Sequence, residues 1–119
     1  MKFTQLEGLT KLAESVTIYI PSTINVNEKA DFFIMQSMKE YVKTAMAETF
    51  GGFTMNEAVG GYKAENGKIV EETVYLVRSN TSEVTEADVK RAVAIAKTVK
   101  RAMNQECVSL EINGELYFV

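Results

Sequence analysis

One stretch of the sequence, from Phe50 to Arg78, constrains the fold more than any other. It reads FGGFTMNEAVGGYKAENGKIVEETVYLVR, with two glycines after a helical pattern and then two strand-like segments around Asn66-Gly67. Asn-Gly favours the tight turns that join antiparallel strands. The stretch therefore predicts a β-hairpin that follows directly on a helix, with Asn66-Gly67 as a two-residue turn.

The turn length fixes which side chains share a face of this hairpin, because Glu65 faces Lys68 across a two-residue turn. In that register one face is apolar and is expected to enter the core, through Val59, Val74 and Leu76. The opposite face carries the tyrosines Tyr62 and Tyr75, together with Tyr19 from a preceding strand. The glycine pair Gly60-Gly61 predicts a bulge or a close approach of backbones in the first strand.

A strand and a helix precede the hairpin. The segment from Val16 to Ile20 alternates apolar and polar residues, as a half-buried strand does, and Pro21 ends it because proline donates no hydrogen bond to a sheet. A helix is then predicted from Asn27, a favourable N-cap, to about Phe50. One of the glycines at 51 and 52 is expected to end this helix in the left-handed conformation.

A second helix and a second hairpin follow. Thr85, with Asp88 three residues later, resembles a capping box and starts a helix that is predicted to run to about Asn104. Strands at 108–112 and 115–119 then flank Asn113-Gly114, which is another hairpin signal. The order of elements is β-α-β-β-α-β-β, with one apolar stripe on each helix.

This order predicts a single α+β domain over residues 16–119, a ferredoxin-like β-α-β-β-α-β sandwich with an added C-terminal hairpin strand. Both helices would cover one face of an antiparallel sheet, and the first strand would lie beside the strand after the second helix. Residues 1–15 are predicted to form an N-terminal arm or short helix. The chain has 119 residues, 46% of them apolar, which is enough for one core.

Several reactive residue types are missing or scarce. The chain has no histidine, which removes the commonest general base and metal ligand. Its only cysteine, Cys107, cannot form an internal disulfide and is expected to be a small buried residue.

The net charge of −3 gives no reason to expect nucleic-acid binding. No apolar run reaches the roughly 20 residues of a membrane span. No signal peptide is recognised, so a cytoplasmic protein is expected.

Neither the glycines nor the carboxylates form a recognisable catalytic motif. A phosphate-binding loop places its glycines between a strand and a helix N-terminus, whereas Gly51-Gly52 follows a helix and Gly60-Gly61 lies within a strand. Glu71 and Glu72 are neighbours on a strand and point to opposite faces, which argues against an acid–base pair. We therefore expect no catalytic residue, no metal and no cofactor. Besides the two binding functions described below, the sequence leaves open an enzyme that uses carboxylates alone, through Glu57, Glu71 and Glu72.

Three surfaces are candidates for contact with a partner. The first is the tyrosine face of the sheet, which favours a homodimer or another protein partner because tyrosine is enriched at interfaces; it comprises Tyr19, Tyr62 and Tyr75. The second is the basic side of the second helix, which either meets phosphate or an acidic partner or is simply solvated; its cations are Lys90, Arg91, Lys97, Lys100 and Arg101. The third is the arm, through Phe3, Leu6 and Leu9.

Four stretches carry a resemblance to known proteins. They are IPSTINVN at 20–27, ETFGGFT at 48–54, the hairpin GGY…GKIVEETVYLV and the tail SLEINGELYFV. Together they resemble a group of small uncharacterised α+β proteins of phages and conjugative elements of Gram-positive bacteria. The resemblance covers most of the chain from Ile20 onward, and it implies a gene context rich in anti-restriction and anti-CRISPR functions. The arm and the DFFIM segment at 31–35 lie outside it.

The absent catalytic set and this resemblance together predict a non-enzymatic, protein-binding inhibitor of mobile-element origin. Its expected partner is a host defence effector, contacted directly. The alternative is a module that binds a small ligand or a nucleotide between the sheet and the basic face of the second helix.

Overall fold

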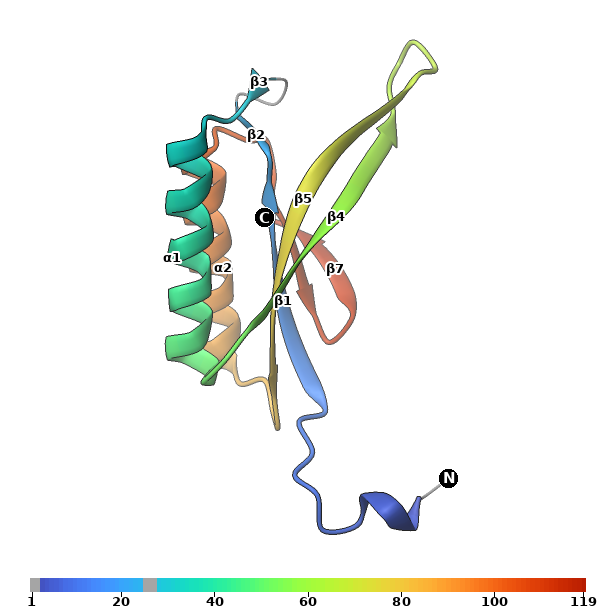
Figure 1. Ribbon diagram of the computed structural model, residues 1–119, viewed down its shortest axis with the longest axis vertical. Coiled ribbons are helices and arrows are strands. Elements are labelled where there is room, and N and C mark those ends of the chain that lie inside the picture. Colours follow the sequence, from blue (N-terminus) through green and yellow to red (C-terminus); the bar gives the residue numbers. More distant parts are fainter. Residues whose placement is uncertain (1–2, 25–27) are drawn as a thin grey trace.

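The computed structural model describes residues 3–24 and 28–119, which form an α+β fold with a five-stranded antiparallel sheet and two helices on one face of it (Figure 1). The strands lie in the order β4-β5-β1-β6-β7. This arrangement is consistent with a ferredoxin-like fold that has gained one strand at an edge. The strands are β1 (Glu14–Pro21), β4 (Thr54–Lys63), β5 (Ile69–Thr81), β6 (Ser109–Ile112) and β7 (Glu115–Phe118). A small ribbon of β2 (Thr23–Ile24) and β3 (Glu28–Lys29) precedes the first helix.

The first helix, α1 (Phe32–Phe50), begins later than the sequence predicts. Its N-cap is Asp31, whose carboxylate accepts a hydrogen bond from the Ile34 N–H at 2.9 Å. The predicted cap, Asn27, lies outside the described residues, and the helix starts five positions beyond it. The C-terminal end agrees with the prediction, because Gly51 adopts the left-handed conformation at φ 92°.

The second helix, α2 (Glu86–Ala102), starts at the predicted capping box. The Thr85 hydroxyl accepts a hydrogen bond from the Asp88 N–H at 3.1 Å, and the Asp88 carboxylate accepts one from the Thr85 N–H at 3.0 Å. Neither described helix is long and apolar enough to cross a membrane.

Replacing Thr85 by alanine removes one half of this box and leaves the Asp88 N–H without its partner. We expect the free energy of unfolding to fall by about 1 kcal/mol. Chemical denaturation of the wild type and the variant measures the change. The control is Thr44→Ala on the exposed side of α1, which is expected to leave stability within about 0.5 kcal/mol of the wild type. Equal effects at the two positions would contradict a capping role.

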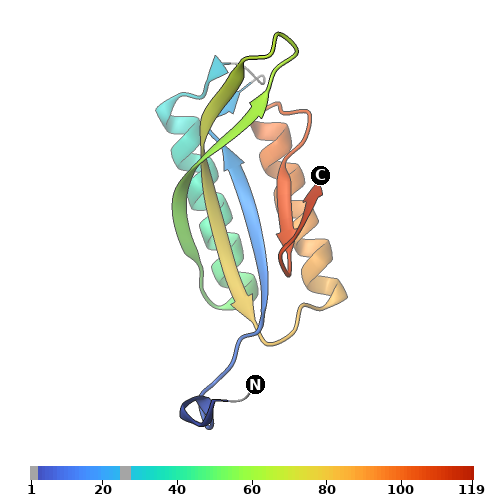
Figure 2. The ribbon, with the colours of Figure 1, turned by 90° about the vertical axis from the view of Figure 1, so that its right-hand side faces the viewer.

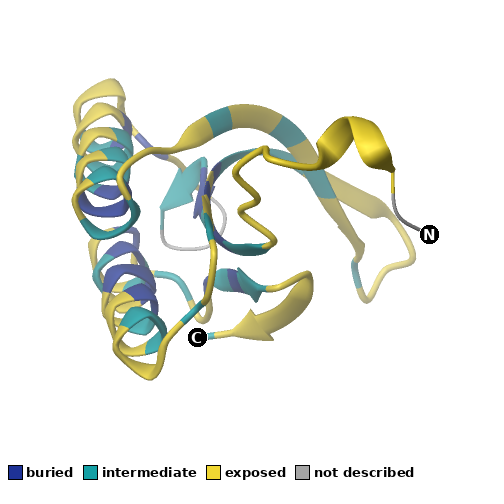
Figure 3. Ribbon diagram, turned by 90° about the horizontal axis from the view of Figure 1, so that it is seen from below, coloured by how far each residue is buried: buried dark blue, intermediate teal, exposed yellow. Residues whose placement is uncertain are grey.

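The core lies between the sheet and the two helices (Figure 3). Strand β1 runs through the centre of the sheet and buries alternate side chains, Val16, Ile18 and Ile20, completely. Each helix packs one stripe against this layer, and the buried residues of α2 are Ala92, Ile95, Ala96 and Val99. The β6 residue Leu110 and the loop residue Met103 close the core at its edge. The burial of small and branched side chains along one face explains why both helices share a side of the sheet.

The β4–β5 hairpin pairs one residue away from the predicted register. Val59 lies opposite Thr73, because three residues rather than two form the loop. The Ala64 N–H donates to the Lys68 carbonyl at 2.8 Å, and the Gly67 N–H donates to the Ala64 carbonyl at 2.9 Å. Gly67 takes a φ of 83°, as the last residue of a three-residue hairpin loop does. The second hairpin has the predicted two-residue turn at 113–114.

A shift of one residue moves every side chain of a strand to the other face. Val77 is therefore the apolar β5 residue that is fully buried, and Leu76 lies beside Tyr19 on the face without helices. Tyr75 instead faces α1, where the Lys39 Nζ lies 3.8 Å from the centre of its ring. The predicted place of Tyr75 on the uncovered face is wrong, as is the predicted burial of the Val59 side chain, which is 69% exposed.

Candidate functional site: a groove on the uncovered face of the sheet

Figure 2 turns the face of the sheet without helices toward the viewer. The side chains on this face line a groove of about 960 Å³. Strands β1, β4, β5 and β6 contribute to it, together with β2, the end of β7 and the loop between α2 and β6. Its lining combines carboxylates, aromatic rings and aliphatic side chains; the residues that matter below are Tyr19, Thr23, Gly60, Tyr62, Glu72 and Gln105. We call it the open-face groove.

The glycine pair of β4 gives the groove its floor. Gly60 lies opposite Glu72 on the uncovered face, so this carboxylate stands across from a position without a side chain; the neighbouring pair, Gly61 and Glu71, belongs to the other face. The pairing runs through both glycines without a bulge. A Cβ on Gly61 would lie 3.1 Å from the Val70 carbonyl oxygen, which confirms the predicted close approach of backbones. A Cβ on Gly60 would lie 3.5 Å from the Val74 side chain, which is an ordinary van der Waals distance. Glycine at this position therefore avoids no clash, and its effect is to leave the groove floor free of a side chain.

Glu72 is the best-held carboxylate of the groove. The Thr23 hydroxyl donates to its Oε2 at 3.0 Å, and the Gln105 side-chain amide donates to the Thr23 carbonyl at 2.8 Å. These bonds join β5, β2 and the loop after α2, three segments far apart in the sequence. Glu72 is half-buried, so its carboxylate faces the groove in a fixed position. Sequence reasoning considered Glu72 but did not predict its partners.

Tyr19 and Glu111 form a second polar pair on the same face of the sheet. The Tyr19 hydroxyl donates to Glu111 Oε1 at 2.9 Å. Burial raises the pKa of Tyr19 above its usual range, and the hydrogen bond and the negative charge of Glu111 raise it further. The phenol therefore remains neutral and acts as a donor at physiological pH.

A raised pKa of this phenol makes the folded state lose stability in alkali. The neutral phenol of Tyr19 contributes to the free energy of unfolding. This contribution is fully present below the unfolded-state pKa of about 10, and it is lost as the pH rises through the higher folded-state pKa. We expect Tyr19→Phe to flatten the fall of unfolding free energy above about pH 10. Denaturation series at several alkaline pH values measure the slope. Tyr62→Phe, at an exposed tyrosine, serves as the control. An unchanged slope for Tyr19→Phe would contradict the assignment.

This arrangement suits a ligand with both positive charge and flat apolar parts. Glu72 and Glu106 bring negative charge to the groove, while Tyr19 and Tyr62 offer ring faces to a cation or an aromatic group. Within residues 3–24 and 28–119, acidic and sulfur side chains gather nowhere as a set of three or more that could hold a metal ion.

The other predicted surfaces lie apart from the groove. The cations of α2 occupy its outer side, because the inner side is buried against the sheet. Hydrophobic side chains thus fill the space between the sheet and α2, where the alternative hypothesis placed a ligand. The arm residues Phe3, Leu6 and Leu9 are exposed and remote from the groove. Cys107 is exposed at the groove margin, and its predicted burial is wrong.

No family model and no curated protein matches the sequence. Two solved structures share the fold over almost the entire chain. One is a phage SAM lyase in complex with S-methyl-5'-thioadenosine, with a TM-score of 0.63 and 18% identity, covering 96% of this chain and 94% of the other. The second is a phage SAM lyase in the apo state, with a TM-score of 0.60 and 17% identity, covering 95% of this chain and 93% of the other.

This likeness contradicts the prediction of a non-enzymatic inhibitor that acts by direct contact with a host effector. The fold that this chain shares is that of an enzyme, over nearly its full length. The missing histidine and the missing catalytic pair exclude only reactions that need those groups, and other reactions remain open to this chain. At 18% and 17% sequence identity, the likeness establishes the fold alone. The open-face groove is the candidate site within that fold.

Proposed function

We propose that the protein binds S-adenosylmethionine (SAM) in the open-face groove and cleaves it as a lyase, releasing S-methyl-5'-thioadenosine. The observation that carries the proposal is Glu72, a carboxylate fixed by Thr23 across from the side-chain-free floor at Gly60. It lies within a fold that the two SAM lyase structures share.

The groove matches SAM in size and in chemistry. Its volume of about 960 Å³ is at the upper end of the range for small-molecule sites. SAM carries two positive groups, the sulfonium and the ammonium, which the carboxylates of Glu72 and Glu106 complement. Its adenine ring and its sulfonium both suit the aromatic faces of Tyr19 and Tyr62.

The proposed cleavage needs no acid or base from the protein. The bond between sulfur and the γ carbon of the methionine part breaks, and its electron pair stays on sulfur, which becomes the neutral thioether of the product. An oxygen of the substrate's own carboxylate forms the new bond to the γ carbon and closes a five-membered lactone. No proton is transferred and no water is consumed, so a chain without histidine can catalyse the step.

For such a reaction the protein contributes position and a dry environment. An intramolecular attack is accelerated when the substrate is held with its carboxylate behind the γ carbon. Glu72 can anchor the ammonium, which keeps its charge throughout the reaction. The aliphatic part of the groove, which includes Val70, Val74 and Leu76, removes water from the sulfonium and carboxylate charges that cancel as the bond forms.

The direct test is to incubate the purified full chain with SAM in ¹⁸O-labelled water and to follow the products by mass spectrometry. We expect S-methyl-5'-thioadenosine and a four-carbon lactone in equal amounts. After later hydrolysis of the lactone, the label should be in the carboxyl group. Label on the γ hydroxyl would indicate attack by water and would contradict the lyase step. Intact SAM at high protein concentration would overturn the proposed function.

An anti-restriction role follows from this chemistry in a form different from the sequence prediction. Cleavage of SAM removes the methyl donor of cellular methyltransferases and the cofactor of SAM-dependent restriction enzymes. The effect would be depletion of a small molecule rather than contact with a host effector. The resemblance to proteins of phages and conjugative elements is compatible with such a role. That resemblance is itself a prediction from the sequence.

A further inference from the structure

Backbone hydrogen bonds at the end of α2 determine where Gln105 leaves the helix. Asn104 adopts the left-handed conformation at φ 47°, which turns the chain away from the helix axis. The Gln105 N–H donates to the Lys100 carbonyl at 3.0 Å, and the Asn104 N–H donates to the Arg101 carbonyl at 3.2 Å. These two bonds define a Schellman motif. Met103, just before the turn, is fully buried in the core, so the turn is anchored and Gln105 starts from a fixed position.

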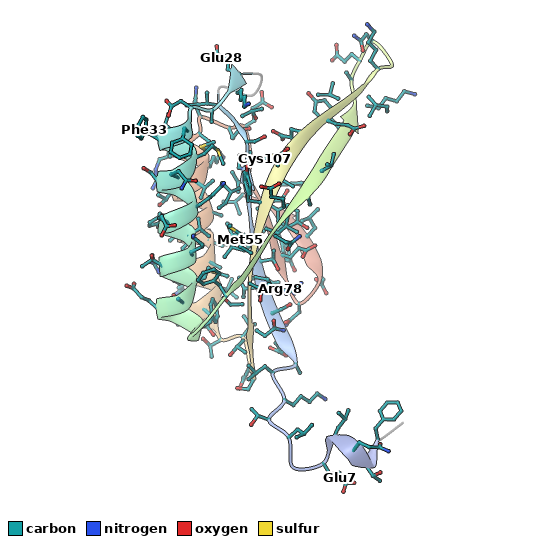
Figure 4. All side chains as sticks on the ribbon, in the orientation of Figure 1. Glu7, Glu28, Phe33, Met55, Arg78 and Cys107 are labelled. Carbon is teal, nitrogen blue, oxygen red and sulfur yellow. The ribbon has the colours of Figure 1, made fainter. Side chains whose placement is uncertain are left out.

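Two carbonyl groups orient the side-chain amide of Gln105. Its Nε2 lies 2.8 Å from the Thr23 carbonyl oxygen and 3.3 Å from the Met103 carbonyl oxygen. Carbonyl oxygens only accept hydrogen bonds, so the NH₂ end of the amide faces them and its oxygen points elsewhere. Figure 4 labels Cys107, two residues further along, in the same half of the molecule as Glu28 of β3. The amide thus ties β2 to the end of α2.

The same amide determines the direction of the hydrogen bond to Glu72. Gln105 Nε2 lies 3.4 Å from the Thr23 hydroxyl oxygen, so it presents an N–H group to this oxygen and keeps the hydroxyl proton away from Gln105. The hydroxyl has one proton, which it donates to Glu72 Oε2 at 3.0 Å. The donors therefore run in one direction, from Gln105 through Thr23 to Oε2 of Glu72, and leave Oε1 for a ligand.

We propose that Gln105 is a positioning residue for the cleavage of SAM, and that it acts on Glu72 through Thr23. The inference rests on the proposed function, in which Glu72 anchors the substrate ammonium. Thr23 and Met103 occupy both N–H groups of the Gln105 amide, so Gln105 contributes the position of the Glu72 carboxylate rather than a donor to the ligand. A direct contact between Gln105 and the ligand is the alternative that the test has to separate.

Steady-state kinetics with SAM test the two supporting residues singly. Gln105→Met keeps the length of the side chain and removes its donors, whereas Thr23→Val removes the hydroxyl and retains the backbone carbonyl. We expect each to raise KM about 3- to 10-fold through the loss of one hydrogen bond. The value of kcat should not change, because the ammonium keeps its charge in the transition state. Thr23→Ser retains the hydroxyl and should keep the wild-type KM, as should the control Gln36→Met on the exposed side of α1.

The double variant, Thr23→Val with Gln105→Met, decides whether Gln105 acts through Thr23. If it does, the second substitution adds nothing, and KM rises only as far as in the single variants. Multiplied effects would mean that Gln105 contacts the ligand independently and would overturn the proposal, as would a wild-type KM in Gln105→Met. S-methyl-5'-thioadenosine has no ammonium and should bind to all variants as it binds to the wild type. A parallel loss of this affinity would reveal a distorted groove and reject the positioning role.

A measurement without ligand separates this inference from the proposed function. Three-bond couplings in the isotope-labelled full chain report whether the Glu72 side chain holds one rotamer. We expect one rotamer in the wild type and in Gln36→Met, and averaging between rotamers in Thr23→Val and Gln105→Met. If the wild type left SAM intact, the proposed function would fail, and the couplings would still decide whether Thr23 and Gln105 hold Glu72. A wild type that cleaves SAM, with one Glu72 rotamer in both variants, would overturn the positioning role alone.

Discussion

Replacing Glu72 by glutamine is expected to lower kcat/KM for SAM by about 10- to 150-fold. The substitution keeps the shape of the side chain and its contact with the Thr23 hydroxyl, and it removes the negative charge across from the glycine floor. A hydrogen bond to a charged group contributes about 1.5–3 kcal/mol, and each 1.36 kcal/mol corresponds to a factor of ten in rate. Steady-state kinetics with SAM measure the loss.

Two controls separate the charge of Glu72 from a general effect. Glu65→Gln removes an exposed carboxylate from the hairpin loop and should leave kcat/KM unchanged. S-methyl-5'-thioadenosine lacks both positive groups of SAM, so its affinity should be the same for the wild type and for Glu72→Gln. If the variant bound this neutral product as weakly as it bound SAM, a distorted groove would explain the loss, and the assigned role of Glu72 would be wrong.

The substitution Gly60→Leu is expected to weaken both ligands together. Gly60 lies on the groove floor, outside the left-handed region, and a Cβ there meets Val74 at an ordinary contact distance. The strand can therefore accept a side chain, which would then occupy the space of the ligand. Overpacking of a fitted site costs about 1–3 kcal/mol, so affinities for SAM and its thioether product should fall by about 5- to 150-fold. Calorimetric titration measures both.

Thr54→Leu is the matched control, because Thr54 lies on the same strand and the same face but outside the groove. It should leave both affinities unchanged. Circular dichroism establishes that each variant is folded. Wild-type affinity in Gly60→Leu would show that the ligand does not use the groove floor.

Two helix ends, the start of α2 and the end of α1, could be predicted because local signals determine them, whereas the start of α1 was wrongly placed at Asn27. The Thr85 capping box and the Gly51 helix end appear as expected. The register of the first hairpin could not be read in this way, since Gly67 fits the left-handed position of a three-residue loop as well as that of a two-residue loop. That single difference reversed the faces of β5 relative to β4 and moved Tyr75 toward the helices.

The groove was beyond sequence reasoning for a different reason. The position of the Glu72 carboxylate depends on Thr23, which lies 49 residues earlier in the chain. It also depends on Gln105, which holds Thr23 and lies 82 residues after it. No local pattern joins three such positions. The glycine pair at 60–61 was the one visible signal, and it was interpreted only as a feature of the backbone. The absence of histidine argued against an enzyme because it was weighed against reactions that need a base.

Amide chemical shifts during titration of the labelled full chain with S-methyl-5'-thioadenosine test the central claim most directly. If the open-face groove is the ligand site, the largest shifts belong to Gly60, Gly61 and Glu72, with smaller shifts at the margin near Cys107. The amides of Lys97 and Arg101, on the outer side of α2, should not move. Large shifts at those two residues with an unperturbed groove would contradict the account and favour a ligand on the basic helix.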